Sequence, residues 1–208
     1  MAIMDRVFAA LYDTIFAAAE KAGLTDLRRG LLSQATGRVL ELGAGTGANA
    51  ALYPAGLDRL VLTEPEELMA KRLRAKVADL GRTDLEVVAA GAQALPFPDD
   101  SFDTVVSTLV LCTVPDVPGA LAEVRRVLAP GGRLLFLEHV RNADPKRARS
   151  QDRFNPIQQR IAGGCHCNRP TPDLLEAAGF TVQGLRNEPF RRAYPVVQPL
   201  AIGTAIPV

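Results

Sequence analysis

The sequence predicts an α/β protein in which a mostly parallel sheet is covered by helices on both faces. Apolar runs with strand character alternate with segments of helical periodicity, an alternation typical of parallel sheets. Residues 39–49 pass from an apolar run directly into glycines at positions 43, 45 and 47, which predicts a strand, a tight turn and a helix. A chain of 208 residues is long enough for one well-buried domain and short for two.

Seven strands are expected, each a short apolar run bounded by glycine, proline or polar residues. They cover residues 38–42, 59–63, 85–89, 103–108, 133–138, 180–186 and 200–206, and the last of them is expected to close the sheet.

Helices are expected between the strands and before the first one. The segment 3–19 carries an apolar stripe at helical spacing, and Gly81 and Gly179 follow two other segments as helix ends. The expected helices cover residues 3–19, 24–35, 65–80, 117–128 and 171–179.

The composition excludes several classes of protein. A formal net charge of +1 argues against a nucleic-acid binder, which usually shows a concentrated basic face. No segment approaches the roughly 18 apolar residues of a membrane span, and no signal-peptide core is seen. Three cysteines do not make a disulfide framework, so we expect a cytoplasmic protein with reduced thiols. The oligomeric state is not predicted.

Two acids decide which ligand the glycine turn binds. The run from Gly43 to Ala48 formally satisfies the dinucleotide pattern, which leaves a nicotinamide oxidoreductase as a competing interpretation. Glu41, just before the glycines, would repel a pyrophosphate, whereas it suits the ammonium and sulfonium of S-adenosylmethionine (SAM). Glu64 ends the next strand about twenty residues further on, the spacing at which an acid meets ribose hydroxyls. SAM is therefore the expected cofactor.

Four segments in order resemble successive motifs of the class I SAM-dependent methyltransferases. They are Glu41–Gly47, Glu64, the stretch Ala94–Asp103 and the stretch Val127–Leu134. The resemblance implies a Rossmann-like, seven-stranded sheet with an N-terminal helical lid. It divides one domain, 1–208, into a lid (1–36), a SAM-binding core (37–140) and an acceptor-side segment with the C-terminal strands (141–208).

The resemblance also implies a set of residues that hold SAM. One departure stands out, because many relatives have an acid that bonds the adenine amino group where this chain has Gly91, so backbone groups and apolar contacts near 91–93 are expected to hold adenine. The implied SAM-binding residues are Glu41, Gly43, Ala44, Gly45, Thr46, Gly47, Asn49, Glu64, Pro65, Gly91, Ala92, Gln93, Thr108 and Leu109.

Further segments resemble one branch of that family, the thiol S-methyltransferases of the methyltransferase-like protein 7 type and their bacterial relatives. They are Thr108–Cys112, Glu138–Val140 and Gly163–Thr171, and the resemblance spans about residues 38–206. It implies a small-molecule acceptor, with a thiol as the first expectation. Family members carry an N-terminal membrane anchor, but this chain has only an amphipathic start, so we expect no integral membrane span.

Alternatives remain open for the activity. Ubiquinone-type and phospholipid N-methyltransferases share much of the same core, so a quinone, phenol or phospholipid methylated on O, C or N is the near alternative. A non-catalytic SAM-binding protein is the alternative of another class.

The acceptor site is expected beyond the carboxyl ends of the fourth and fifth strands, near Cys112 and His139. Tyr12 in the N-terminal helices, and Cys165 and His166 in the segment 142–170, belong to elements free to act as a lid. His139 is a candidate base, because imidazole titrates near neutral pH. The competing interpretation is a structural histidine that ends the fifth strand.

A metal site is not expected. Cys165 and Cys167 are separated by one residue, whereas zinc sites usually show two to four between their cysteines. The other soft ligands, Cys112 and His139, lie far from them in sequence.

Overall fold

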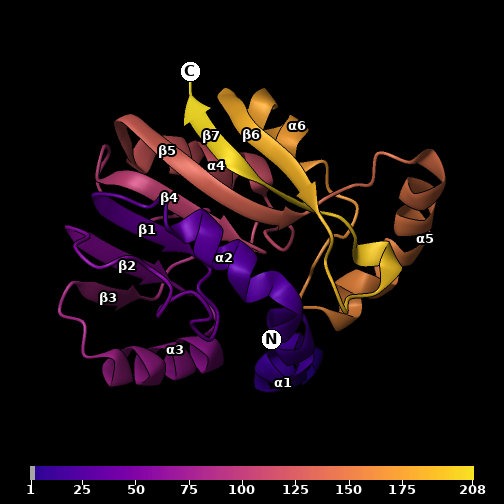
Figure 1. The fold of residues 1–208 in the computed structure, drawn as a ribbon, viewed down its shortest axis with the longest axis horizontal. Helices are drawn as coiled ribbons and strands as arrows, with labels where there is room; N and C mark the ends of the chain where they lie inside the picture. The colour runs from indigo at the N-terminus through magenta and orange to yellow at the C-terminus, as the bar shows by residue number, and fades with distance from the viewer. Residues whose placement is uncertain (1–2) are drawn as a thin grey trace.

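The structure is a computed structural model that describes the backbone of residues 3–208 and the side chains from residue 11 onward. Seven strands form one sheet in the order β3-β2-β1-β4-β5-β7-β6 (Figure 1). The strands are β1 (Arg38–Leu42), β2 (Arg59–Thr63), β3 (Leu85–Val88), β4 (Phe102–Thr108), β5 (Leu128–His139), β6 (Phe180–Glu188) and β7 (Leu200–Pro207). The Rossmann-like fold with a seven-stranded, mostly parallel sheet is confirmed.

The first five strands run parallel, while β7 pairs antiparallel with both β5 and β6. The last strand therefore enters between β5 and β6, and β6 rather than β7 lies at that edge of the sheet. The expected start of the fifth strand at 133 was late, because pairing with β4 begins at Leu128 and resumes at Arg133 after an irregularity.

The helices divide between the two faces of the sheet. They are α1 (Ile3–Ala19), the π-helical turn η1 (Glu20–Leu24), α2 (Thr25–Leu32), α3 (Glu67–Leu80), α4 (Val117–Val127), α5 (Pro145–Ile161), α6 (Thr171–Ala177) and the 3-10 turn η2 (Pro195–Val197). Side chains of α4 and α6 pack on one face, against Leu40, Leu134 and Phe136. Side chains of α2 and α3 pack on the other face, against Val39, Leu62 and other strand residues. None of the helices in the described range is long and apolar enough to cross a membrane.

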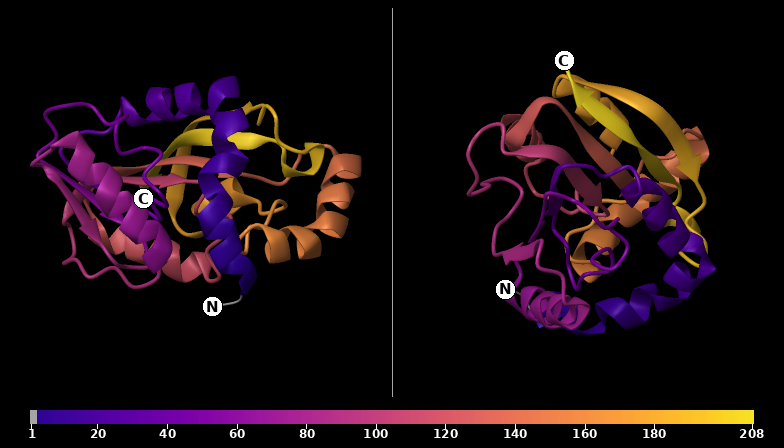
Figure 2. Two further views of the ribbon diagram at one scale, coloured as in Figure 1. Left: turned by 90° about the horizontal axis from the view of Figure 1, so that it is seen from below. Right: turned by 60° about the vertical axis from the view of Figure 1, so that its left-hand side comes forward.

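Helix α1 stands apart from these layers. Figure 2 shows it between α3 and α5, and it contacts both. Gly23, with φ of 125°, lies in η1, where the chain kinks between α1 and α2. The kink directs α1 across the end of the sheet at which the parallel strands finish, so its residues reach the candidate site.

Candidate active site

The glycine turn after β1 borders a cavity of about 520 Å³ at the carboxyl ends of the strands. Gly43 and Gly45 line it with φ of 51° and 59°, a left-handed region that favours glycine. A Cβ built on Gly45 meets no atom within 4 Å, so the backbone at this position is open to a ligand. The turn is held from below, where the amide of Ala44 donates to the carbonyl of Thr63 over 2.7 Å.

Glu64 ends β2 beside this turn and lines the same cavity. One carboxylate oxygen accepts the amide hydrogen of Gly45 at 2.8 Å, and the other accepts that of Glu66 at 2.9 Å. Burial raises the pKa of Glu64, whose side chain is only 5% exposed, while these two hydrogen bonds lower it. A carboxylate has about four acceptor positions, so two remain for hydroxyl groups of a ligand.

The third wall comes from the loops after β3 and β4. Pro65, Gly91, Ala92, Gln93 and Leu109 line the cavity. The nearest atom to a Cβ built on Gly91 is 4.0 Å away, so this edge has room for a planar group. Leu109 has φ of 60°, which is uncommon for a residue with a side chain and marks backbone strain beside the cavity.

Glu41 lies beneath the glycine turn and does not line the cavity. Its carboxylate accepts hydrogen bonds from Asn49 at 2.8 Å and from the hydroxyl of Tyr53 at 2.7 Å. Arg28 donates to both Asn49 and Thr108, which completes a buried polar network. Burial raises the pKa of Glu41 to about 7.

Asn49 and Thr108 therefore also act below the turn rather than on its surface. Sequence reasoning missed Arg28 and Tyr53, because a lone arginine on a helix gives no sign that it is 3% exposed. Thr46 and Gly47 are the remaining expected residues of the turn. The hydroxyl of Thr46 donates to Asp13 of α1. Gly47 packs closely against α3, since a Cβ built on it would meet Leu73 at 2.8 Å.

Helix α1 contributes Tyr12 to the cavity wall. Its ring stacks on Phe16 at 4.6 Å between centroids, and Phe16 in turn stacks on Phe190 at 6.2 Å. Burial raises the pKa of Tyr12 to about 12, so its hydroxyl stays protonated at neutral pH. Asp13 bonds Thr46 and Arg72, and these contacts attach α1 to the glycine turn and to α3.

Behind the remaining wall, Cys112, His139 and Cys165 come together. Their sulfur and ring nitrogen atoms all lie within 4.8 Å of one another, and Nδ1 of His139 is 3.4 Å from Sγ of Cys165. The three side chains are 1%, 4% and 5% exposed and do not line the cavity, although their neighbours Thr113 and Gly164 do. These residues lie far apart in the sequence, which argued against a joint site, but the fold brings them together in one cluster.

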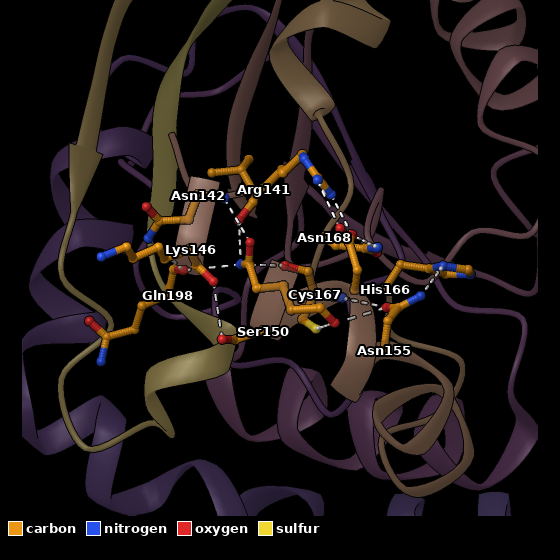
Figure 3. A network of polar contacts seen from close by, with 12 residues as sticks. Arg141, Asn142, Lys146, Ser150, Asn155, His166, Cys167, Asn168 and Gln198 are labelled. Atoms are coloured by element: carbon orange, nitrogen blue, oxygen red, sulfur yellow. Dashed lines mark hydrogen bonds and ion pairs between the residues drawn. The ribbon is translucent and has the colours of Figure 1, made fainter. Parts of the chain in front are cut away.

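His166 and Cys167 point elsewhere. Figure 3 shows His166 beside Asn155, with Nδ1 and Nδ2 3.4 Å apart, and Cys167 beneath α5, where its amide donates to the Asn155 side chain at 3.1 Å. The side chains of Cys165 and Cys167 thus lie in two different environments.

A buried carboxylate fixes the loop that carries Cys112. Glu138 accepts the hydroxyl of Ser107 at 2.6 Å and the amides of Val110, Leu111 and Cys112 at 3.0, 3.0 and 3.2 Å. From the other side, the Arg169 guanidinium donates to the carbonyls of Leu111 and Val114. The loop is thereby held rigid beside the cavity without any ligand.

Comparisons with known proteins agree with this geometry. A methyltransferase domain model matches residues 40–136. The human thiol S-methyltransferase TMT1B is 39% identical over 84% of this chain and 73% of its own length. The ubiquinone/menaquinone biosynthesis C-methyltransferase UbiE of Hahella chejuensis is 38% identical, but over only 56% of this chain and 49% of its own.

The fold comparison is broader. A crystal structure of a SAM-dependent methyltransferase from Thermotoga maritima superposes with a TM-score of 0.71, covers 98% of this chain and 99% of its own, and is 23% identical. The open glycine turn with Glu64 beside it gives SAM a fitting cradle. The chain belongs to the class I SAM-dependent methyltransferases, in the family that includes the thiol S-methyltransferases.

Proposed function

We propose that this enzyme methylates the thiol of a small molecule, with SAM held on the glycine turn. Of the residues that line the cavity, we assign Gly43, Gly45, Glu64 and residues 91–93 to the cofactor half. We assign Tyr12, Leu109, Val110, residues 113–115 and residues 163–164 to the acceptor half. In this assignment the lid is residues 1–36, the SAM-binding core is 37–140, and the acceptor side is 141–208.

The observation that carries the choice of a thiol is the absence of a base in the acceptor half. Among the described lining residues the ionisable groups are Tyr12, Glu64 and Glu66, and both acids belong to the cofactor half. Tyr12 is protonated at neutral pH, and His139 lies behind the wall. A thiol needs little base catalysis, because a few per cent of it is already thiolate at neutral pH.

SAM supplies a methyl group on a positively charged sulfur. The acceptor's sulfur attacks that carbon in line as the bond to the sulfonium breaks, which leaves a thioether and S-adenosylhomocysteine, while the thiol proton passes to water. The chain's own contribution is alignment by its rigid loops and exclusion of water by Tyr12 and α1. The relation to the thiol S-methyltransferases over most of the chain supports this choice over a quinone.

The buried state of the three cysteines, which form no disulfide, supports a reducing, cytoplasmic location. A net charge of +1 supports small molecules rather than nucleic acid as partners.

An acceptor screen with methyl-labelled SAM tests the proposal. Each thiol is paired with its hydroxyl analogue, such as thiophenol with phenol, and quinols and amines complete the panel. We expect methylation of thiols alone, with a rate that rises toward the pKa of each thiol. Inert thiols beside methylated quinols, phenols or amines would contradict the thiol assignment, and SAM binding without any product would indicate a non-catalytic SAM-binding protein.

A further inference from the structure

The cluster of Cys112, His139 and Cys165 has the composition and the spread of a metal site. A tetrahedral zinc ion lies about 2.3 Å from sulfur and about 2.1 Å from nitrogen, which puts two sulfurs and one nitrogen roughly 3.5–3.8 Å apart. Nδ1 of His139 is 3.4 Å from Sγ of Cys165, and no two of the three donor atoms are more than 4.8 Å apart. A small shift of side chains therefore suffices for coordination.

Three different elements bring these ligands together, and each is held by its own backbone contacts. Cys112 donates its amide to Glu138, and its carbonyl accepts the amide of His166 at 2.7 Å. His139 ends β5, where it pairs with Leu200 of β7. The amide of Cys165 donates to the carbonyl of Ala162 at 3.0 Å. The donor atoms are thus positioned before any ion arrives.

One polar atom of the cluster has no partner in the part of the chain that the structure describes. Nε2 of His139 is buried and has no hydrogen-bond partner among the described residues, and the ring otherwise rests against Phe190 at 5.1 Å between centroids. Zn²⁺ would bind both sulfurs as thiolates, so the thiol protons of Cys112 and Cys165 would pass to water when the ion binds.

We propose that Cys112, His139 and Cys165 bind a Zn²⁺ ion whose fourth position takes the sulfur of the acceptor. Three protein ligands with one open position are the arrangement of catalytic rather than structural zinc. The ion would lie behind the cavity wall formed by Thr113, Gly163 and Gly164, because Thr113 follows Cys112 and the two glycines precede Cys165. The acceptor's sulfur must therefore pass between Thr113 and these glycines to reach the ion.

The chemistry fits the acceptor class and rests on the proposed function above. A thiol that binds Zn²⁺ releases its proton to water and remains a thiolate at neutral pH. The acceptor's sulfur then uses one of its electron pairs to form the new bond to the methyl carbon. The bond from that carbon to the sulfonium breaks at the same time, and its electron pair stays on the sulfur of S-adenosylhomocysteine. The neutral thioether is a weaker ligand than the thiolate and leaves the ion.

Metal content of the full-length protein tests the site. Protein made in zinc-supplemented medium and kept reduced with a phosphine is expected to carry about one Zn²⁺ per chain. Cys112→Ser, Cys165→Ser and His139→Ala are expected to lose it, whereas Cys167→Ser, which removes a buried cysteine outside the cluster, retains it. Circular dichroism melts check that the variants fold. The inference is overturned if wild-type protein with reduced thiols neither carries nor takes up zinc. It is also overturned if Cys112 and Cys165 are found joined in a disulfide.

Cobalt substitution tests the open position. Wild-type protein loaded with Co²⁺ is expected to show sulfur-to-cobalt charge transfer and the visible bands of a tetrahedral ion, and an alkyl thiol, but not its alcohol analogue, shifts those bands. If added thiols do not shift the Co²⁺ absorption bands, the proposed coordination of the acceptor's sulfur is overturned. Unchanged thiol methylation by chelator-stripped protein overturns the inference and leaves the proposed function standing. Failure of every thiol with the metal-loaded enzyme overturns the proposed function instead.

Discussion

At the scale of single residues, Gly45 combines a left-handed backbone with open space above its Cα. Gly56 shares both properties, with φ of 81° and no atom within 4 Å of a built Cβ, but does not line the cavity. We expect Gly45→Ala and Gly56→Ala to lose similar stability, about 1–2 kcal/mol for a left-handed alanine. Only Gly45→Ala should weaken SAM binding, on the order of tenfold or more, since its methyl group enters the ligand's space. Calorimetric titration checks this, and equal SAM affinity in both variants would contradict it.

Glu41 makes a second prediction, about pH. Its folded pKa is about 7 against an ordinary value of 4.5, so between these pH values the folded chain binds more protons than the unfolded chain. The contribution of Glu41 to the free energy of unfolding is therefore fully present below about pH 4.5 and is lost as the pH rises from 4.5 through 7. Glu41→Gln should remove this slope, so that its stability relative to wild type rises by up to about 3 kcal/mol between pH 4.5 and 8. Denaturant unfolding without SAM tests it; parallel profiles would show that Glu41 titrates normally.

The contact between residues at the ends of neighbouring parallel strands could be predicted from the sequence. The contact between residues that only the tertiary fold brings together could not. Gly45 and Glu64 follow two neighbouring strands, and parallel strands finish at one edge, so their meeting could be expected from the sequence. Cys112, His139 and Cys165 are about 26 residues apart in succession, on a loop, a strand end and a turn. No spacing rule relates such positions, so the cluster became visible only in the structure.

At the scale of elements, helix α1 was foreseeable and α5 was not. The apolar stripe of 3–19 marks the first helix. The buried positions of α5 repeat at helical spacing but include three polar residues, so no hydrophobic stripe signals the helix; they are Ala148, Gln151, Asn155 and Gln158. Gln151 and Asn155 bond backbone groups instead: the Gln151 amide donates to the carbonyls of Val140 and Cys167, and the Asn155 side chain accepts the amide of Cys167.

Helix α1 makes the prediction at this scale. Removing residues 1–17 takes away Tyr12 and Asp13 but keeps Glu20, which holds the buried guanidinium of Arg28 at 3.0 Å. The shortened protein should therefore melt cooperatively, yet lose most of its turnover because water enters the cavity. Thermal denaturation and steady-state kinetics measure the two effects. Turnover at the wild-type rate would remove α1 from the site.

At the scale of the whole molecule, the strand positions were predictable from the chain, but the strand order was not. Apolar runs reveal where strands lie, whereas the insertion of β7 between β5 and β6 depends on pairings across the chain, such as Phe136 with Gly203. At that position a Cβ on Gly203 would meet the ring of Phe136 at 3.0 Å, so the close approach of the two strands requires glycine. A glycine inside a strand is a sign of such contact, but it does not name the partner.

Residues from all three parts of the chain, 1–36, 37–140 and 141–208, line the cavity, and this makes the last prediction. Because SAM binds the folded state, SAM at about one hundred times its Kd should add about 2.7 kcal/mol and raise the Tm by roughly 5–10 °C. Hydrogen exchange should slow in α1 and in residues 109–110, 113–115 and 163–164, which line the cavity, and stay unchanged at the far end of the β6–β7 pair. Gly45→Ala serves as the control, because at the same SAM concentration a tenfold weaker affinity should roughly halve the added stability. Protection confined to the glycine turn would mean that SAM does not couple the lid to the core.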